Sequence, residues 1–176
     1  MPFIITQLSG YKSHFEEIRD AQRLASRQLP NVGLAVTIDI GDKDDIHPHN
    51  KTDVGYRLAC EAERLCYGRK TVSAGPLCRS MEVKGKYVVL SFDNVGSGLV
   101  ARGNNDGKLN HFEISDNSGS FFLADAQIQG DKVVVSSSKV QFPCAVRYAW
   151  LPYAADINFY NAEGFPASPF KITSGQ

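Results

Sequence analysis

The stretch that decides the fold reads Leu34-Ala-Val-Thr-Ile-Asp-Ile-Gly-Asp-Lys-Asp-Asp-Ile-His-Pro-His-Asn50. Its first part, residues 34–40, is almost continuously apolar, as in a parallel strand that is covered on both faces. Its second part is an acidic loop that contains His47. Open α/β sheets carry their functional groups at the carboxyl ends of the strands. The order therefore predicts a buried strand that delivers an acid–histidine pair to such an edge.

His47 and the aspartates before it form the candidate site. A carboxylate can hold an imidazole in one tautomer and stabilise its cationic form, so that the ring acts as a general base. Asp42, Asp44 and Asp45 are all within reach in sequence, and spacing alone leaves the choice open. We find no nucleophile for this base, because Gly96-Ser97-Gly98 lacks the G-x-S-x-G frame and lies among predicted hairpins.

The residues around this stretch predict a strand–helix–strand–loop–helix unit over residues 1–69. Residues 3–8 are predicted to form a short strand, and Ser13 with Glu16 has the pattern of a capping box. Asn50 can cap a second helix that ends near Gly68. Apolar spacing predicts the inner faces of the two helices; the positions are Phe15, Ile18, Gln22, Ala25 and Leu29 in the first, and Val54, Leu58, Ala62 and Leu65 in the second.

From about residue 70 the apolar period changes from 3.6 to 2, which favours β-structure. Three hairpins are predicted over residues 81–92, 112–123 and 126–135, turning at Lys84-Gly85 in the first and at Gly130-Asp131 in the third. A further strand is predicted over residues 144–150, and the proline-containing tail, residues 164–170, is predicted to be an extended strap. We therefore expect α/β plus all-β architecture, with an α/β unit at residues 1–69 and an antiparallel β-sandwich-like domain at residues 70–176.

Two parallel strands and two helices make an incomplete sheet. A stable sheet needs at least three strands or more helix cover. The sequence therefore predicts that further sheet is supplied by another segment or by a partner, and that the unpaired edge favours self-association.

The composition excludes several classes of function. Nineteen basic and nineteen acidic residues give no net charge, so no basic field favours nucleic acid. The apolar runs are too short to cross a membrane, and residues 1–7 show no basic region or cleavage signature of a signal peptide. The acidic run lacks the glycine and terminal glutamate of a calcium loop, and the four cysteines lack metal-site spacing. We expect no metal or cofactor, and buried free thiols.

Several segments, in this order, resemble the catalytic C-terminal block of the sialate O-acetylesterases, carbohydrate esterases of the SGNH-hydrolase superfamily. The segments are Thr37-Ile-Asp-Ile-Gly-Asp42, Asp45-Ile-His-Pro48, Val54-Gly-Tyr-Arg-Leu58, Ser73-Ala-Gly-Pro76, Leu90-Ser-Phe-Asp-Asn-Val-Gly-Ser-Gly-Leu99, Val146-Arg-Tyr-Ala-Trp150, Asn158-Phe-Tyr-Asn161 and Pro166-Ala-Ser-Pro-Phe170. The resemblance runs from about residue 3 to residue 171 and is specific because several blocks recur in order.

The resemblance implies a three-layer α/β/α esterase domain, of which residues 1–69 are the last part, followed by a β-rich domain. It implies removal of O-acetyl groups from sialic acid or related glycans, without metal. His47 carries over as the base. The superfamily spacing selects Asp44 as its partner, whereas the sialate esterase pattern selects Asp45, which we favour.

Family members carry the catalytic serine in a Gly-Gln-Ser-Asn-like block, which does not occur in these 176 residues. The resemblance therefore predicts a C-terminal portion that is inactive alone and needs an upstream serine-bearing segment or a second polypeptide. The alternatives are a non-enzymatic glycan-binding or interaction module, and the degenerate half of a split gene. Relatives are usually secreted, periplasmic or lysosomal.

Overall fold

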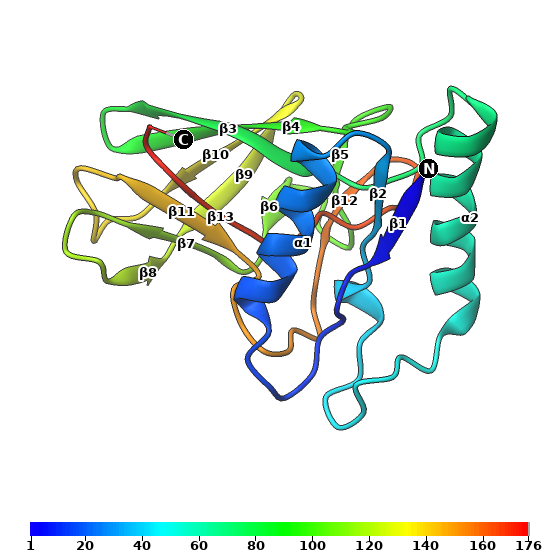
Figure 1. Ribbon diagram of the computed structural model, residues 1–176. Coiled ribbons are helices and arrows are strands. Elements are labelled where there is room, and N and C mark those ends of the chain that lie inside the picture. The colour runs from blue at the N-terminus through cyan, green and yellow to red at the C-terminus, as the bar shows by residue number, and fades with distance from the viewer. Residues whose placement is uncertain (176) are drawn as a thin grey trace.

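In the computed structural model, which describes residues 1–175, the chain begins with two parallel strands joined by a helix (Figure 1). Strand β1 (Phe3–Thr6) pairs in parallel with β2 (Val32–Ala35), and α1 (Glu16–Gln28) connects them. The loop after β2 leads to α2 (Lys51–Tyr67). The predicted strand–helix–strand–loop–helix order is confirmed, and the protein has a mixed α/β fold.

Strand β2 is shorter than the apolar run predicts. It ends at Ala35, and residues Ile38–Ile40 form a 3₁₀ turn, η1, so the prediction of a strand through residue 40 is wrong. The reason is the loss of the pairing partner, because β1 ends at Thr6. The Thr37 hydroxyl donates to the Gln7 carbonyl at 2.6 Å, and the Ile40 amide donates to the Thr37 carbonyl, which turns the chain away from the sheet.

Helix α1 differs from the prediction at its start and on its faces. It begins at Glu16 without a side-chain cap, so Ser13 does not form the capping box. Its buried side chains are Glu16, Arg19 and Arg23, while Ile18 and Leu29 of the predicted inner face are 47% and 57% exposed. The helix therefore turns a polar face inward, and its apolar stripe stays partly open.

The arginines of α1 bind main-chain oxygens of the β-rich part. Arg19, which is fully buried, donates to the carbonyls of Leu151 and Pro152 at 2.9 and 2.8 Å. Arg23 and Arg27 both donate to the Cys78 carbonyl. Burial lowers the pKa of Arg19, and the charge of Glu16 opposes that shift. These bonds explain why charged residues occupy the inner face of the helix.

Helix α2 begins and ends where the sequence predicts. The Asn50 side chain accepts a hydrogen bond from the Asp53 amide at 3.1 Å, which satisfies one free donor of the first turn. Gly68 ends the helix in the left-handed conformation with φ of 64°.

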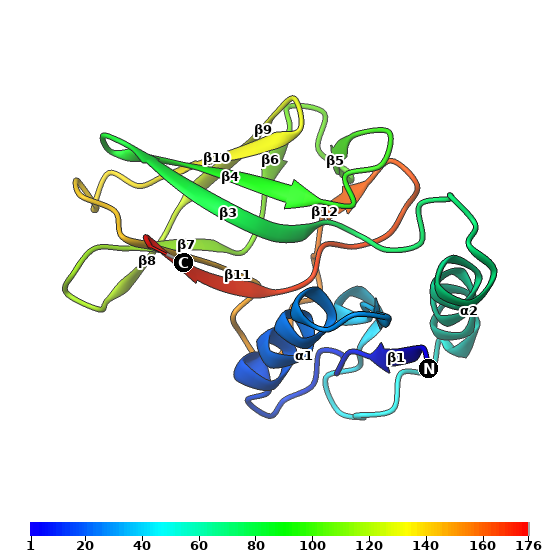
Figure 2. The ribbon, with the colours of Figure 1, turned by 45° about the horizontal axis from the view of Figure 1, so that its top comes forward.

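The rest of the chain is mostly antiparallel β-structure (Figure 2). One sheet has the order β3-β4-β10-β9-β6, a second has the order β13-β11-β7-β8, and β12 pairs with β5. The bounds are β3 Leu77–Lys84, β4 Tyr87–Asp93, β5 Leu99–Ala101, β6 Lys108–Leu109, β7 Phe112–Ser115, β8 Phe121–Leu123, β9 Asp125–Gln129, β10 Lys132–Ser136, β11 Ala145–Tyr148, β12 Phe159–Asn161 and β13 Phe170–Thr173.

The three predicted hairpins are present as β3–β4, β7–β8 and β9–β10. The third turns at Gly130-Asp131 as predicted, whereas the first turns at residues 85–86, one position later than predicted. The predicted strap at residues 164–170 leads into β13, which pairs with β11 along its whole length. Strand β13 (Phe170–Thr173) is only four residues long and follows both prolines of the tail, and sequence analysis did not predict it.

One apolar cluster reaches across residue 69. It joins Leu34, Val36 and Ile38 of the α/β unit to Val88, Phe159 and other core residues of the β-rich part. The cluster includes Tyr148, Phe112 and Phe170, whose rings contact one another. The division into units at residues 69 and 70 stays a prediction.

Within residues 1–175 no helix is long and apolar enough to cross a bilayer, and no three His, Cys, Asp or Glu side chains gather as metal ligands. The four cysteines are free thiols. Cys78 is buried, but Cys66 is exposed, so the prediction of burial is wrong for Cys66.

The lack of a side chain at Gly41 permits residues 9–12 to pass close to the end of η1. A Cβ atom on Gly41 would lie 2.3 Å from the Gly10 carbonyl oxygen and 2.5 Å from its nitrogen, whereas a Cβ on Gly55 in α2 would meet nothing within 4 Å.

We predict opposite effects for alanine at these two glycines. Gly41→Ala forces backbone apart and should lower the free energy of unfolding by more than about 2 kcal/mol. Gly55→Ala should raise it by about 0.5–1 kcal/mol, because glycine is a poor helix former. Urea denaturation of both variants checks this, and equal effects would contradict the packing at Gly41.

Candidate active site

The loop between η1 and α2 brings one aspartate against His47. Asp45 Oδ1 lies 3.2 Å from His47 Nδ1 and also accepts the His47 amide at 2.8 Å. The same carboxylate lies 3.8 Å from His49 Nε2 through its other oxygen. An aspartate bound to Nδ1 holds the imidazole with Nε2 turned to the outside, which is the arrangement of a general base.

The other two candidate carboxylates do not contact the His47 ring. Asp44 pairs with Lys12 at 3.6 Å and is 79% exposed, and its amide donates to Asp42 Oδ1 at 2.9 Å. The structure therefore brings together Asp45 and His47 and leaves Asp42 and Asp44 in the turn before them.

His47 is open to solvent on the side away from Asp45. Its side chain is 81% exposed, and no residue among 1–175 makes a hydrogen bond to its Nε2 atom. The hydrogen bond from the His47 amide is the largest cause of a lowered pKa at Asp45, and the His47 ring contributes in the same direction. The pair is thus set for an ionised carboxylate at neutral pH.

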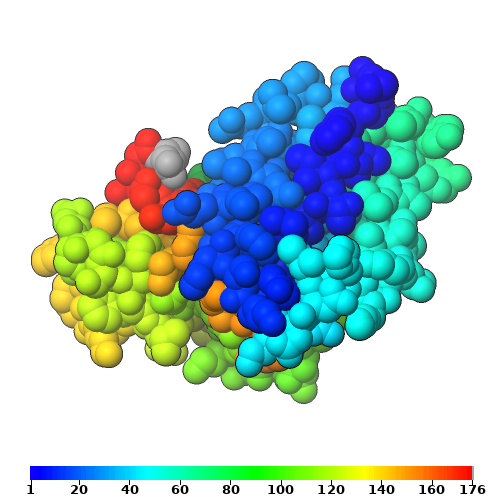
Figure 3. Space-filling view, turned by 60° about the horizontal axis from the view of Figure 1, so that its bottom comes forward, coloured from blue at the N-terminus to red at the C-terminus, as the bar shows by residue number. Residues whose placement is uncertain are grey.

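The loop is hydrogen-bonded to the turn after β1, and that turn is hydrogen-bonded to the segment after β11. The Lys12 amide donates to the Lys43 carbonyl at 3.1 Å, and the Tyr11 amide donates to the Pro152 carbonyl at 3.0 Å. Figure 3 shows the corresponding blue, cyan and orange segments side by side on one face of the molecule. The acid–histidine loop, the turn after β1 and the segment after β11 therefore meet at the carboxyl end of the parallel strands.

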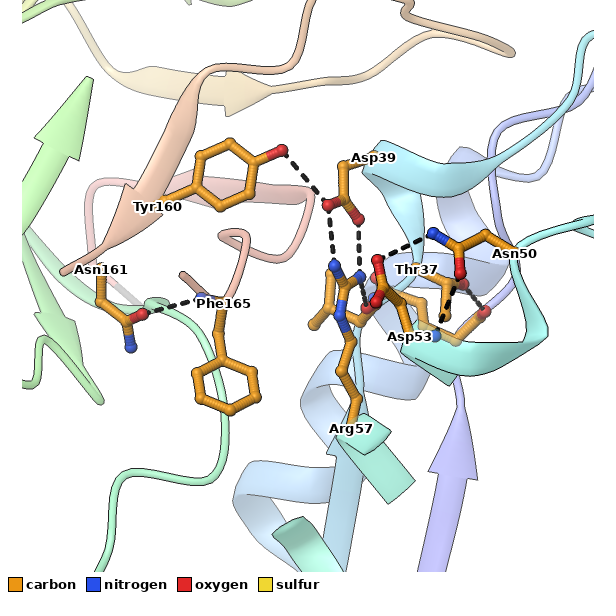
Figure 4. A network of polar contacts seen from close by, with 10 residues as sticks. Thr37, Asp39, Asn50, Asp53, Arg57, Tyr160, Asn161 and Phe165 are labelled. Atoms are coloured by element: carbon orange, nitrogen blue, oxygen red, sulfur yellow. Dashed lines mark hydrogen bonds and ion pairs between the residues drawn. The ribbon is translucent and has the colours of Figure 1, made fainter. Parts of the chain in front are cut away.

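A buried ion pair lies directly behind this loop, and sequence analysis did not identify it. Arg57 of α2 binds both oxygens of Asp39 at 2.6 and 2.8 Å, and both side chains are only 7% exposed (Figure 4). Arg57 also donates to the Val36 carbonyl, and the Tyr160 hydroxyl donates to Asp39 at 3.2 Å. Burial raises the pKa of Tyr160 to about 12, and the Asp39 charge adds to the shift. The sequence shows an aspartate after an apolar run and an arginine on a predicted helix, but it does not show that the two residues pair.

The aromatic residues near the C-terminal end are mostly core. Tyr148, Phe159 and Tyr160 are buried. Arg147 and Trp150 are half-buried and line a surface hollow of about 660 Å³ together with residues of the α1 N-terminus.

Comparisons with known proteins indicate the class of protein to which this mixed α/β chain is similar. A carbohydrate acetylesterase from Xanthomonas citri matches 98% of this chain with a TM-score of 0.92 and 39% identity. Sialate O-acetylesterases from Rattus norvegicus and Homo sapiens are each 28% identical over 96% of the chain. No family model matches. The chain is a relative of the sialate O-acetylesterases, as the sequence motifs predict.

The match covers only part of each relative. The chain spans 35% of the rat sialate O-acetylesterase and 41% of the Xanthomonas citri chain.

We predict that Asp39→Ala is strongly destabilising. Removal of the carboxylate leaves the Arg57 guanidinium buried without its counter-charge, which should cost about 3–5 kcal/mol in the free energy of unfolding. Asp125→Ala is the matched control, because Asp125 is 82% exposed and pairs with Lys108 at 3.5 Å. That variant should change stability by less than about 1 kcal/mol. Similar losses of unfolding free energy in both variants would contradict the prediction that the buried pair matters more to stability than an exposed one.

We also predict that the Asp45 carboxyl titrates below 3.8, its ordinary pKa. A lowered pKa means that the folded loop favours the ionised form, so its stabilising effect is present at neutral pH and is lost as the pH falls through the lowered pKa. Carboxyl NMR titration checks this, with the change in His47 amide shift as a second reporter. A pKa at or above 3.8 would contradict the observed hydrogen bond.

Proposed function

We propose that this chain supplies the acid–histidine part of a Ser-His-Asp hydrolytic site in a carbohydrate O-acetylesterase that acts on sialic acid or a related glycan. His47 is the general base, and Asp45 is the residue that positions it. The observation that supports this most directly is the 3.2 Å contact between Asp45 Oδ1 and His47 Nδ1, with Nε2 facing outward. The similarity to carbohydrate acetylesterases supports the substrate class.

In the proposed reaction, a serine hydroxyl attacks the acetyl carbonyl and His47 Nε2 accepts its proton. The imidazolium then donates that proton to the departing sugar oxygen, which leaves an acetyl-serine. His47 next takes a proton from water, which attacks the acetyl-serine, and the imidazolium returns that proton to the serine oxygen as acetate leaves. Asp45 stays ionised throughout and stabilises the imidazolium.

We propose that the nucleophile and the oxyanion donors belong to a segment outside residues 1–176, in the same or a second polypeptide. The greater length of the relatives supports this assignment. In this proposal residues 1–69 complete a three-layer α/β/α esterase domain, and residues 70–176 form a β-sandwich-like domain beside it. Without oxyanion donors a base alone lacks most of the transition-state stabilisation, so the chain alone should be inactive.

We predict the following for p-nitrophenyl acetate hydrolysis. The chain alone should not exceed the background rate. A chimera in which residues 1–176 replace the matching part of the Xanthomonas citri acetylesterase should hydrolyse the ester, and His47→Ala should reduce kcat by about 10⁶-fold. Asp45→Asn keeps an oxygen for the His47 amide but removes the charge, and should reduce kcat by at least about 10²-fold.

Asp44→Asn is the matched control for the positioning role, because Asp44 contacts Lys12 and not the ring. It should keep kcat within about threefold of the parent chimera. Thermal unfolding of each variant separates a loss of function from a loss of fold. Turnover by the chain alone that disappears with His47→Ala would overturn the proposal and indicate a serine within residues 1–176.

A further inference from the structure

The loop that follows β11, residues 149–158, is closed at its base by Asn110 and His111. At its start, the Ala149 amide donates to the His111 carbonyl at 2.9 Å. Near its end, Asp156 Oδ1 lies 2.6 Å from His111 Nε2, and the Asn110 side chain donates to Asp156 Oδ2 at 3.2 Å. Two neighbouring residues therefore hold both ends of the loop.

The tip of this loop is bound to α1, and its start has a strained backbone. Arg19, which is buried, donates to the carbonyls of Leu151 and Pro152. Ala149 has a φ of 48°, in the left-handed region, which is unfavourable for a residue with a Cβ atom. The contacts at the base and at the tip maintain this conformation, so Trp150 is presented on a segment that is ordered in advance of any ligand.

Trp150 and the first turn of α1 line a hollow of about 660 Å³. Sites for small ligands in proteins have volumes of about 300–1,000 Å³. Ile18 lies on the helix wall of this hollow and is 47% exposed, and Trp150 on the loop wall is half-buried. Apolar side chains that converge on an open concave surface gain free energy when a ligand with an apolar face displaces the water.

The polar groups of the hollow include one free carboxylate and one fixed guanidinium. Glu17 is exposed and makes no hydrogen bond or ion pair within residues 1–175. Arg147 donates through Nε and Nη2 to the two oxygens of Glu113, at 2.8 and 3.0 Å, and its guanidinium lies 4.2 Å from the centre of the Phe121 ring. Its Nη1 group has no partner among the described residues, so it can donate to a ligand.

This combination of groups fits an uncharged pyranose sugar. The C–H face of a pyranose packs on an indole ring, while its hydroxyls donate to carboxylates and accept from guanidinium groups. Lys171 Nζ lies 6.0 Å from the centre of the Trp150 ring and does not line the hollow, so it covers one face of the indole and leaves the other to the hollow. The Arg147 charge is balanced by Glu113 whereas the Glu17 charge is not, which disfavours an anionic ligand.

The hollow lies beside the acid–histidine loop. The Tyr11 amide donates to the carbonyl of Pro152, which lines the hollow, and the next amide, of Lys12, donates to the Lys43 carbonyl of that loop. Because the Cα atoms of adjacent residues are only about 3.8 Å apart, the hollow and the loop are neighbours. Figure 3 shows the orange segment against the blue and cyan segments on this face.

We propose that this hollow is a subsite of the esterase and binds an uncharged pyranose that neighbours the acetylated sugar in the glycan. The proposal rests on the proposed function, because it takes the acid–histidine loop to be part of a hydrolytic site. It adds that the substrate is an oligosaccharide, and it names Trp150, Glu17 and Arg147 as the residues that bind the second sugar.

Trp150 reports directly on the hollow, because it is the only tryptophan in the chain and its indole N–H gives a single NMR signal. At least one of the neutral sugars lactose, cellobiose and N,N′-diacetylchitobiose should shift this signal saturably in the 176-residue chain. No shift with any of the three would overturn the proposal. Sialic acid alone should bind at least about 10-fold more weakly than the neutral sugar, and tighter binding of this anion would also overturn the proposal.

Glu17→Ala tests the carboxylate of the hollow. It should weaken binding of the same sugar by at least about 10-fold, because hydrogen bonds to a charged acceptor are lost. Glu82→Ala is the matched control, because Glu82 lies on β3, is 65% exposed and pairs with Lys84 at 3.3 Å. It should leave the affinity unchanged, and thermal unfolding of both variants checks that the fold is kept. Equal affinities of the two variants would contradict the role of Glu17.

The chimera with the Xanthomonas citri acetylesterase tests the subsite in hydrolysis. Trp150→Ala should raise KM for mono-O-acetylated lactose by at least about 10-fold more than KM for p-nitrophenyl acetate, because only the disaccharide has a second sugar to lose. Trp150→Phe keeps an aromatic ring and should recover part of the loss, which distinguishes lost stacking from a lost fold. Equal increases in KM for both esters would overturn the proposal.

His47→Ala separates this proposal from the proposed reaction. It should abolish hydrolysis by the chimera, while the sugar-dependent shift of the Trp150 signal persists in the 176-residue chain. An inactive parent chimera with that shift intact would refute the reaction and keep the hollow as a sugar-binding site. An active chimera, with no sugar-dependent shift in the 176-residue chain, would overturn the subsite and keep the reaction.

Discussion

The ion pair between Asp39 and Arg57 is the contact on which the arrangement of the site depends. Asp39 lies in η1, where the chain leaves the parallel sheet, and Arg57 lies in α2, where the chain returns from the acid–histidine loop. One bidentate contact therefore fixes the distance between the two ends of residues 41–50. The Tyr160 hydroxyl extends the contact to β12, so the α/β unit and the β-rich part share it. Removal of one partner of a buried pair leaves the other charge uncompensated, so the two side chains depend on each other.

Local signals predicted a large part of the fold. The Asn50 cap, the Gly68 stop and the Gly130-Asp131 turn each act within a few residues, and all three lie where the sequence places them. The errors have non-local causes. Strand β2 ends early because its neighbour β1 ends. Helix α1 turns Arg19 inward because carbonyl oxygens more than a hundred residues away in sequence accept hydrogen bonds from its guanidinium group. The spacing of apolar residues on a helix carries no information about such distant acceptors.

The candidate site was predictable as a segment but not as a set of contacts. The acidic loop before His47 is evident in the sequence, yet spacing leaves Asp42, Asp44 and Asp45 equivalent. The turn decides among them, because the His47 amide and ring both meet the Asp45 carboxylate. The Asp39–Tyr160 hydrogen bond joins residues 121 positions apart, and no single-sequence pattern contains that information.

The arginines of α1 have a consequence for how this protein can diverge. Arg19, Arg23 and Arg27 bind main-chain oxygens of residues 151, 152 and 78, and every amino acid offers such an oxygen. Mutational drift at those three acceptor positions therefore leaves the hydrogen bonds intact, provided that the backbone path is kept. The constraint is one-sided: these hydrogen bonds require the guanidinium groups of the helix but no particular side chain at the acceptor positions.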